Sequence, residues 1–111
     1  MVRVCFLAPM GAMSFVEVDD NPMAWHDLLG GYMELFALPM TLPHGLVGLA
    51  DEDGYRKDLP MNAYAALLKQ AIVGPVIIAR SEPPEFVDLT ERDVIALEEW
   101  FGHSVIVVIG Q

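Results

Sequence analysis

Short runs of branched and aromatic residues recur along the chain and alternate with segments of helical spacing. The apolar runs are bounded by Gly, Pro, Asp or Asn, and such runs are typical of β-strands. The last of them is apolar at every position, which favours a strand buried on both faces of a sheet. We expect strands over 2–8, 13–18, 32–38, 45–50, 76–79, 86–87 and 105–109.

Three segments carry apolar residues at the spacing of an amphipathic helix, over 22–29, 62–71 and 91–101. The first follows an Asn-Pro pair, a favoured helix start, and Gly30 and Gly31 are expected to stop it. The third opens on Thr90 with Asp93 three residues later, as in a capping box, and Gly102 is expected to end it. The pattern predicts an α+β domain with three short helices and a mixed or antiparallel sheet of about six strands.

The chain has 111 residues, which is enough for one hydrophobic core and too short for two. We therefore expect a single domain over 1–111, with a C-terminal strand in 102–111. The apolar share of 54% is high for so small a domain, and an interface between two copies in a homodimer would explain it. No uncharged apolar stretch approaches the roughly 20 residues that span a bilayer, so no membrane partner is expected. A single cysteine, Cys5, lies in an apolar run; we expect it to be buried and the protein to be cytoplasmic.

Acidic residues outnumber basic ones, and the formal net charge is −10. Direct binding to nucleic acid is therefore not expected, because that affinity comes from clustered Lys and Arg. The acids are scattered along the chain, as on a solubilising surface. An acidic mimic of a nucleic acid, which would inhibit a DNA-binding enzyme, is an alternative that this charge leaves open.

Five short motifs occur in an order and spacing that together resemble a known family. They are LLGGYME over 28–34, DG at 53–54, LPMNAYA over 59–65, IVGPV over 72–76 and DLTERD over 88–93. The chain from 1 to 101 resembles in this way the uncharacterised family called domain of unknown function 3846. The resemblance implies an accessory protein of a phage or mobile element, and it implies no reaction.

The candidate binding residues are Tyr32, Glu34 and Asn62. A carboxylate on a strand beside aromatic residues suits a cationic or hydroxyl-bearing ligand, and a buried one could serve a small enzyme. Asn62 is also a good N-cap for the second helix, so its amide has a structural role as an alternative. We expect any pocket to lie where the bend at Gly30 and Gly31 meets the start of the second helix.

No cluster of residues in the sequence predicts a metal, a cofactor or a catalytic group. The three histidines, His26, His44 and His103, are far apart and lack the spacing of metal ligands. The acidic segment 51–54 lacks the later Glu of a calcium loop and predicts a turn. The sequence therefore favours a non-catalytic binding protein whose ligand is a protein or a small polar molecule.

Overall fold

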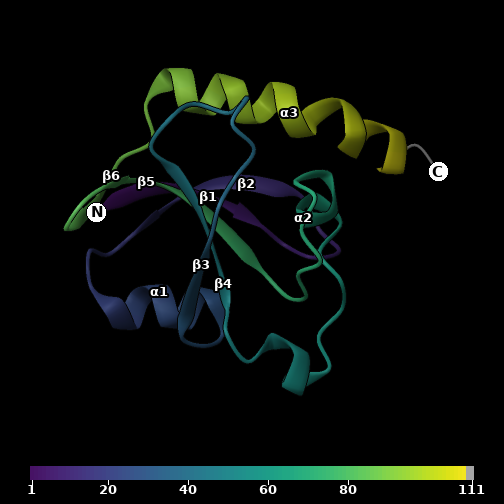
Figure 1. Ribbon diagram of the computed structural model, residues 1–111, viewed down its shortest axis with the longest axis horizontal. Helices are drawn as coiled ribbons and strands as arrows, with labels where there is room; N and C mark the ends of the chain where they lie inside the picture. The colour runs from purple at the N-terminus through teal and green to yellow at the C-terminus, as the bar shows by residue number, and fades with distance from the viewer. Residues whose placement is uncertain (110–111) are drawn as a thin grey trace.

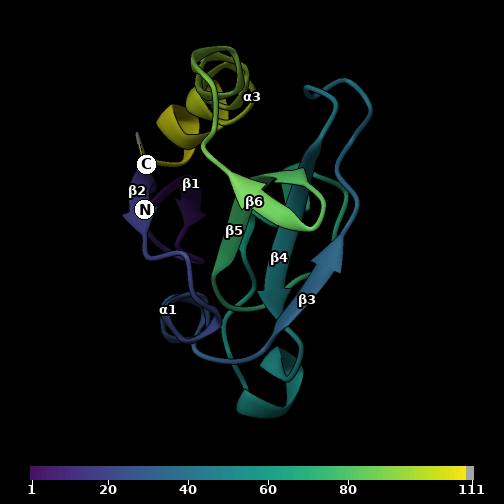
Figure 2. The ribbon, with the colours of Figure 1, turned by 90° about the vertical axis from the view of Figure 1, so that its left-hand side faces the viewer.

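The computed structural model describes residues 1–109, whose strands form one antiparallel sheet. The sheet order is β2-β1-β5-β4-β3, and the short β6 pairs with the end of β5. Figure 2 shows β2 and β3 at opposite edges. The predicted α+β class is confirmed. The strands are β1 (Val2–Leu7), β2 (Met13–Val18), β3 (Met33–Phe36), β4 (Leu46–Asp51), β5 (Val76–Glu82) and β6 (Glu85–Val87).

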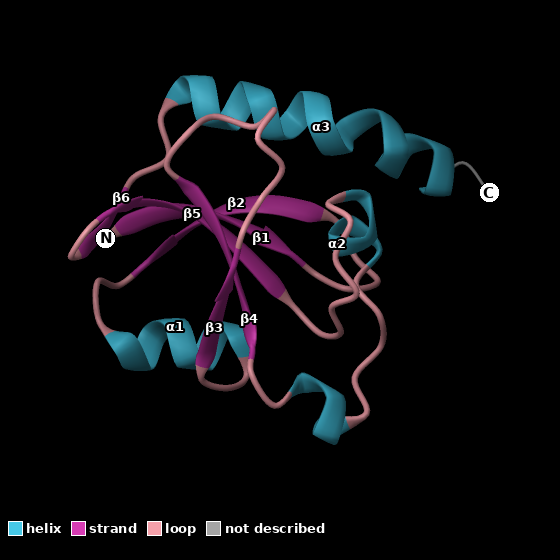
Figure 3. Ribbon diagram, viewed as in Figure 1, coloured by secondary structure: helices cyan, strands magenta, loops and turns pink. Residues whose placement is uncertain are grey.

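Helices cover both faces of this sheet (Figures 1 and 3). The helical elements are α1 (Pro22–Leu29), the 3₁₀ turn η1 (Gly54–Lys57), α2 (Ala63–Leu67) and α3 (Glu91–Ile109). Trp25 and Leu29 of α1 are buried in a cluster on one face of the sheet. The other cluster takes residues from α2 and α3, including Tyr64, Leu97 and Phe101. The sheet is thus the middle layer between α1 and the pair α2 and α3.

Strand β5 lies at the centre of the sheet and is buried on both faces. Val76 and Ile78 face α3, while Ile77 and Ala79 face α1. The neighbouring β1 places Cys5 in the cluster that contains residues of α2 and α3, and burial raises the pKa of the Cys5 thiol to about 12. Cys5 is therefore a protonated core residue at neutral pH, as its apolar setting in the sequence predicted.

The predicted strand over 105–109 is wrong, because α3 continues through Gly102 to Ile109. A glycine inside a helix costs only about 1 kcal/mol relative to alanine and does not by itself end it. No proline follows it in the chain, and a short apolar run fits a helix as well as a strand. The predicted strand region also includes 110–111, which lie outside the described residues.

Helix α2 is shorter than its predicted range, and this difference shapes the rest of the molecule. The helix closes with Lys69 in the left-handed conformation at φ 64°, and the Gln70 N–H donates to the Ala65 carbonyl at 3.0 Å. This bond spans five residues, as in a glycine-ended helix. Residues 70–73 therefore leave the helix and run on beside the sheet.

Within residues 1–109, no helix is both long enough and apolar enough to span a bilayer.

Candidate functional site

A cavity of about 210 Å³ opens between the β3–β4 end of the sheet and the segment 70–73. This volume is below the roughly 300–1,000 Å³ of sites for drug-sized ligands, and it suits a single side chain or a small amine. Its lining comes from three parts of the chain that lie far apart in sequence. The lining residues are Glu34, Leu35, Phe36, Ala50, Asp51, Glu52, Tyr55, Gln70, Ala71, Ile72 and Val73.

The floor of the cavity is built by the face of the sheet that also carries α2 and α3. Glu34 pairs in register with Ala50, and Phe36 pairs with Gly48, so these four residues share that face. The Phe36 ring lies directly over Gly48, where a Cβ atom would overlap it. Gly48 therefore leaves the space on the neighbouring strand that the far end of the Phe36 ring occupies.

The opposite wall is the extended segment 70–73, which the early end of α2 releases. Its backbone is fixed from both sides: the Asn62 N–H donates to the Ile72 carbonyl at 2.8 Å, and the Tyr55 hydroxyl donates to the Ala71 carbonyl. The Gln70 side chain reaches across to donate to the Ala37 carbonyl at 3.4 Å. These contacts hold the wall at a set distance from β3.

The rim of the cavity is acidic. Glu34 and Glu52 are exposed, and neither has an ion-pair partner among the described residues. Tyr55 is 71% exposed and adds an aromatic surface beside them. Over the part of the chain that the structure describes, no group of three His, Cys, Asp or Glu is arranged to hold a metal ion. The rim therefore offers hydrogen-bond acceptors and negative charge to an organic group.

Asp51, the last residue of β4, is buried beside this site but its carboxylate is already engaged. Lys57 Nζ donates to Asp51 Oδ2 at 2.6 Å and to the Gly30 carbonyl at 2.7 Å, and the Asp53 N–H donates to Asp51 Oδ1 at 2.9 Å. Burial acts to raise the pKa of Asp51, but the bonds from Lys57 and Asp53 outweigh it and lower the pKa below its ordinary value. Asp51 thus anchors η1 to the end of α1 and is not a free acceptor.

The two glycines after α1 have different roles in this anchor. Gly30 adopts the left-handed conformation at φ 82° and caps α1, as the sequence predicted for the pair. Gly31 has no such backbone conformation; instead a Cβ atom there would overlap the Asp51 carboxylate. The second glycine is therefore required for space.

We expect Gly31→Ala to destabilise the protein by about 1–3 kcal/mol, the usual cost of forcing extra atoms into a packed site. The matched control is Gly30→Asn, because asparagine tolerates the left-handed conformation and nothing lies within 4 Å of a Cβ at position 30. Urea unfolding monitored by tryptophan fluorescence measures both. Equal stability of Gly31→Ala and the wild type would contradict the close contact with Asp51.

The structure brings one of the three predicted binding residues to the cavity. Glu34 lines it, whereas Tyr32 and Asn62 are not among its lining residues. Tyr32 is 66% exposed in the turn before β3, where its ring meets that of His26 edge-on at 4.7 Å between centroids. We expected any pocket to lie where the bend at Gly30 and Gly31 meets the start of the second helix. At that bend the structure has the Asp51–Lys57 ion pair, and Lys57 also donates to the Gly30 carbonyl.

Asn62 is fully buried, and its amide is occupied on both sides. Nδ2 donates to the carbonyls of Leu7 at 3.0 Å and Gly74 at 2.9 Å. Oδ1 accepts from the N–H groups of Tyr64 at 3.0 Å and Ala65 at 3.1 Å. This geometry is the helix N-cap that the sequence offered as the alternative role, extended by a tie to β1.

Besides Asp51, three polar lining residues were not identified from the sequence: Glu52, Tyr55 and Gln70. The segment 51–54 predicted a turn, and Glu52 and Tyr55 indeed follow β4 at that turn and in η1. Gln70 was expected inside a helix, and no glycine marks the point where α2 ends. A left-handed lysine carries no signal in a single sequence, so this wall of the cavity could not be predicted.

The chain matches no family model, no curated protein and no solved structure. The resemblance to domain of unknown function 3846 accordingly stays a prediction.

Proposed function

We propose that the protein is a non-catalytic binding protein whose cavity beside β3 receives a small cationic or hydrogen-bond-donating group. The observation that carries this proposal is the pairing of an acidic rim with an apolar interior. Glu34 and Glu52 supply negative charge at the opening, and Phe36, Ile72 and Val73 line the space behind them. An alkylammonium group matches both parts, because its methylenes pack on the apolar walls while its charge meets the carboxylates.

The cavity offers a place for such a group without offering an activated nucleophile. Among its described lining residues the polar side chains are carboxylates, one phenol and one amide, and the buried carboxylate of Asp51 is paired with Lys57. These groups bind and orient a cation. The setting implied by the family resemblance, an accessory protein of a phage or mobile element in the cytoplasm, is part of this proposal.

The proposal also includes the homodimer that the composition favours, with β2 as the contact. β2 is a six-residue strand at an edge of the sheet, no strand within residues 1–109 pairs with its outer side, and it carries a single charge, Glu17. Long edge strands with few charges are templates for pairing with another chain. Pairing at β2 would leave the cavity at the opposite edge open.

The test is a titration with n-butylammonium followed by amide NMR shifts, with butyrate as the probe of opposite charge. We expect n-butylammonium to shift signals around the cavity, and Glu34→Gln to weaken its binding at least tenfold. Glu17→Gln on β2 removes the same charge at the other edge and is expected to leave binding unchanged. If butyrate bound as tightly as n-butylammonium, or if neither probe shifted any signal, the cavity proposal would be overturned. Native mass spectrometry of the same sample reports the subunit count, and a monomer at every concentration would overturn the dimer.

A further inference from the structure

Strand β3 has one unpaired edge, and its register with β4 shows which backbone groups face it. The Glu52 N–H donates to the Tyr32 carbonyl at 2.9 Å, so these opposed residues form a hydrogen-bonded pair. Such pairs alternate along an antiparallel ladder. The backbone groups of Glu34 and Phe36 therefore face β4, and those of Met33 and Leu35 face away. Within residues 1–109, no strand pairs with this outer edge.

The cavity reaches this same edge. Leu35 belongs to the cavity lining. Leu35 pairs in register with Leu49, which lies in the cluster that also contains residues of α1, so the Leu35 side chain is on the face of the sheet opposite the cavity. The contact with Leu35 is thus at the edge of the strand. Ala37 is two residues further along, so its carbonyl also faces outward, and it is the group that accepts from Gln70. The free edge is open at Met33 and Leu35 and closed by Gln70 beyond them.

The surface around the open edge is apolar and acidic together. Leu35 is 58% exposed and Tyr32 is 66% exposed, and the carboxylates of Glu34 and Glu52 lie beside them at the rim. A second copy of this chain is a poor occupant, because pairing β3 with itself would bring equal acidic rims together on two chains of net charge −10. A basic partner has the complementary charge.

We propose that an extended segment of a basic partner protein adds to the sheet as a strand beside β3 and inserts one Lys or Arg side chain into the cavity. The inference rests on the proposed function, because it takes the inserted side chain to be the cationic group. The outward N–H and C=O of Met33 and Leu35 bond the peptide backbone, and alternate side chains of the peptide lie over Leu35. Glu34 and Glu52 then select the charge of the inserted residue.

The probes are labelled heptapeptides with Val and Thr alternating and Lys, Arg or Glu at the centre, followed by fluorescence anisotropy. We expect the Lys and Arg peptides to bind at least tenfold more tightly than the Glu peptide. Leu35→Pro removes an outward N–H that β4 does not use, and proline is tolerated on an edge strand. It is expected to weaken binding of the Lys peptide at least tenfold more than Leu35→Thr does, because Leu35→Thr alters the same side chain but retains the backbone N–H.

A second arm keeps the protein unaltered, so that it does not depend on the folding of a variant. N-methylation of the Lys peptide at the backbone positions that face β3 is expected to abolish binding. Binding that survives N-methylation and Leu35→Pro would overturn strand addition. So would equal affinity for the Glu peptide, or no binding of any peptide. If n-butylammonium still binds in those cases, the cavity function stands and strand addition alone fails; if the amine also fails, both fall.

Discussion

Replacing Asn62 with alanine is expected to lower the free energy of unfolding by at least about 3 kcal/mol, because one buried amide serves four backbone groups. The substitution removes the N-cap of α2, a change that typically costs about 1 kcal/mol. It also leaves the Leu7 and Gly74 carbonyls without their buried donor, and each such unsatisfied group costs roughly 1–3 kcal/mol. A domain of this size is stable by only about 5–15 kcal/mol, so the loss is a large fraction.

The chain contains its own control for this substitution. Asn21 caps α1 with the same chemistry, accepting from the Ala24 N–H at 2.9 Å, but it is exposed and makes no further tie. Asn21→Ala should therefore cost about 1 kcal/mol, the cap alone. Guanidinium unfolding of the two variants beside the wild type measures the difference. Equal losses would mean that the bonds from Nδ2 to the two carbonyls add no stability.

The contrast between these two asparagines shows how far the sequence could predict the fold. Both carry the local signal of an N-cap, and both caps are present in the structure. Local signals also predicted the capping box of Thr90 and Asp93 at the start of α3, and the structure contains it. The burial of Asn62 against β1 depends on a contact between residues 55 apart in sequence, and no local pattern contains that information.

Two apolar runs that predicted strands show the same limit. Residues 76–79 follow a Gly-Pro pair and form the centre of the sheet, whereas 105–109 follow directly on a helix and continue it. Periodicity cannot separate a short strand from a helical turn when every position is apolar. The cavity depends on distant contacts in the same way. Glu34 and its strand were predicted, but the opposite wall, segment 70–73, depends on where α2 ends.

Replacing Arg80 with leucine is expected to destabilise the protein by about 3 kcal/mol at pH 7, the lower end of the cost of breaking a buried ion pair. Arg80 Nε and Nη2 bind the two carboxylate oxygens of Asp93 at 2.7 and 2.6 Å, and the Asp93 side chain is 1% exposed. Asp93 Oδ2 also accepts from the Thr90 N–H at 2.9 Å, so the pair joins β5 to the first turn of α3. Without the guanidinium, a buried carboxylate remains uncompensated.

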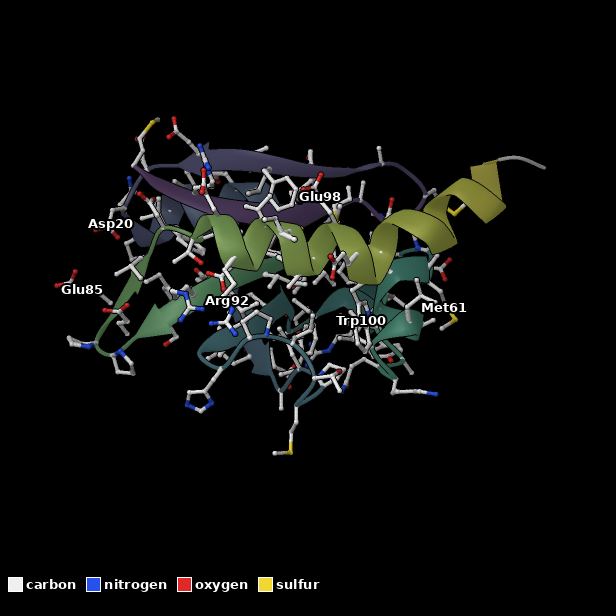
Figure 4. All side chains as sticks on the ribbon, turned by 90° about the horizontal axis from the view of Figure 1, so that it is seen from above. Asp20, Met61, Glu85, Arg92, Glu98 and Trp100 are labelled. Carbon is white, nitrogen blue, oxygen red and sulfur yellow. The ribbon has the colours of Figure 1, made fainter. Side chains whose placement is uncertain are left out.

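The exposed neighbour Arg92 provides the matched control, because Arg92→Leu removes the same charge from α3 without touching a buried group. Figure 4 looks down on α3 and shows Arg92 and Trp100 on one side of the helix and Glu98 on the other. We expect Arg92→Leu to change the stability by less than about 0.5 kcal/mol. A comparable loss in both variants would indicate a general effect of net charge and would contradict a specific role for Arg80.

The pH dependence of the Arg80 variant separates an ion pair from simple packing. Burial acts to raise the pKa of Asp93, but the bonds from Arg80 and Thr90 outweigh it and lower the pKa below its ordinary value. A carboxyl whose folded pKa is depressed contributes stability above the unfolded value of about 3.9 and loses it as the pH falls through the folded pKa. The gap between the wild type and Arg80→Leu should therefore be full at pH 7 and shrink as the pH falls. It shrinks first because Asp93 in the variant, buried without its cation, takes up a proton above the ordinary carboxyl pKa, and then because the wild type loses the ion pair as the pH falls through its depressed pKa. Urea unfolding over a series of pH values below 7 measures the gap, and a gap that stays constant would show that Arg80 acts through its packing alone.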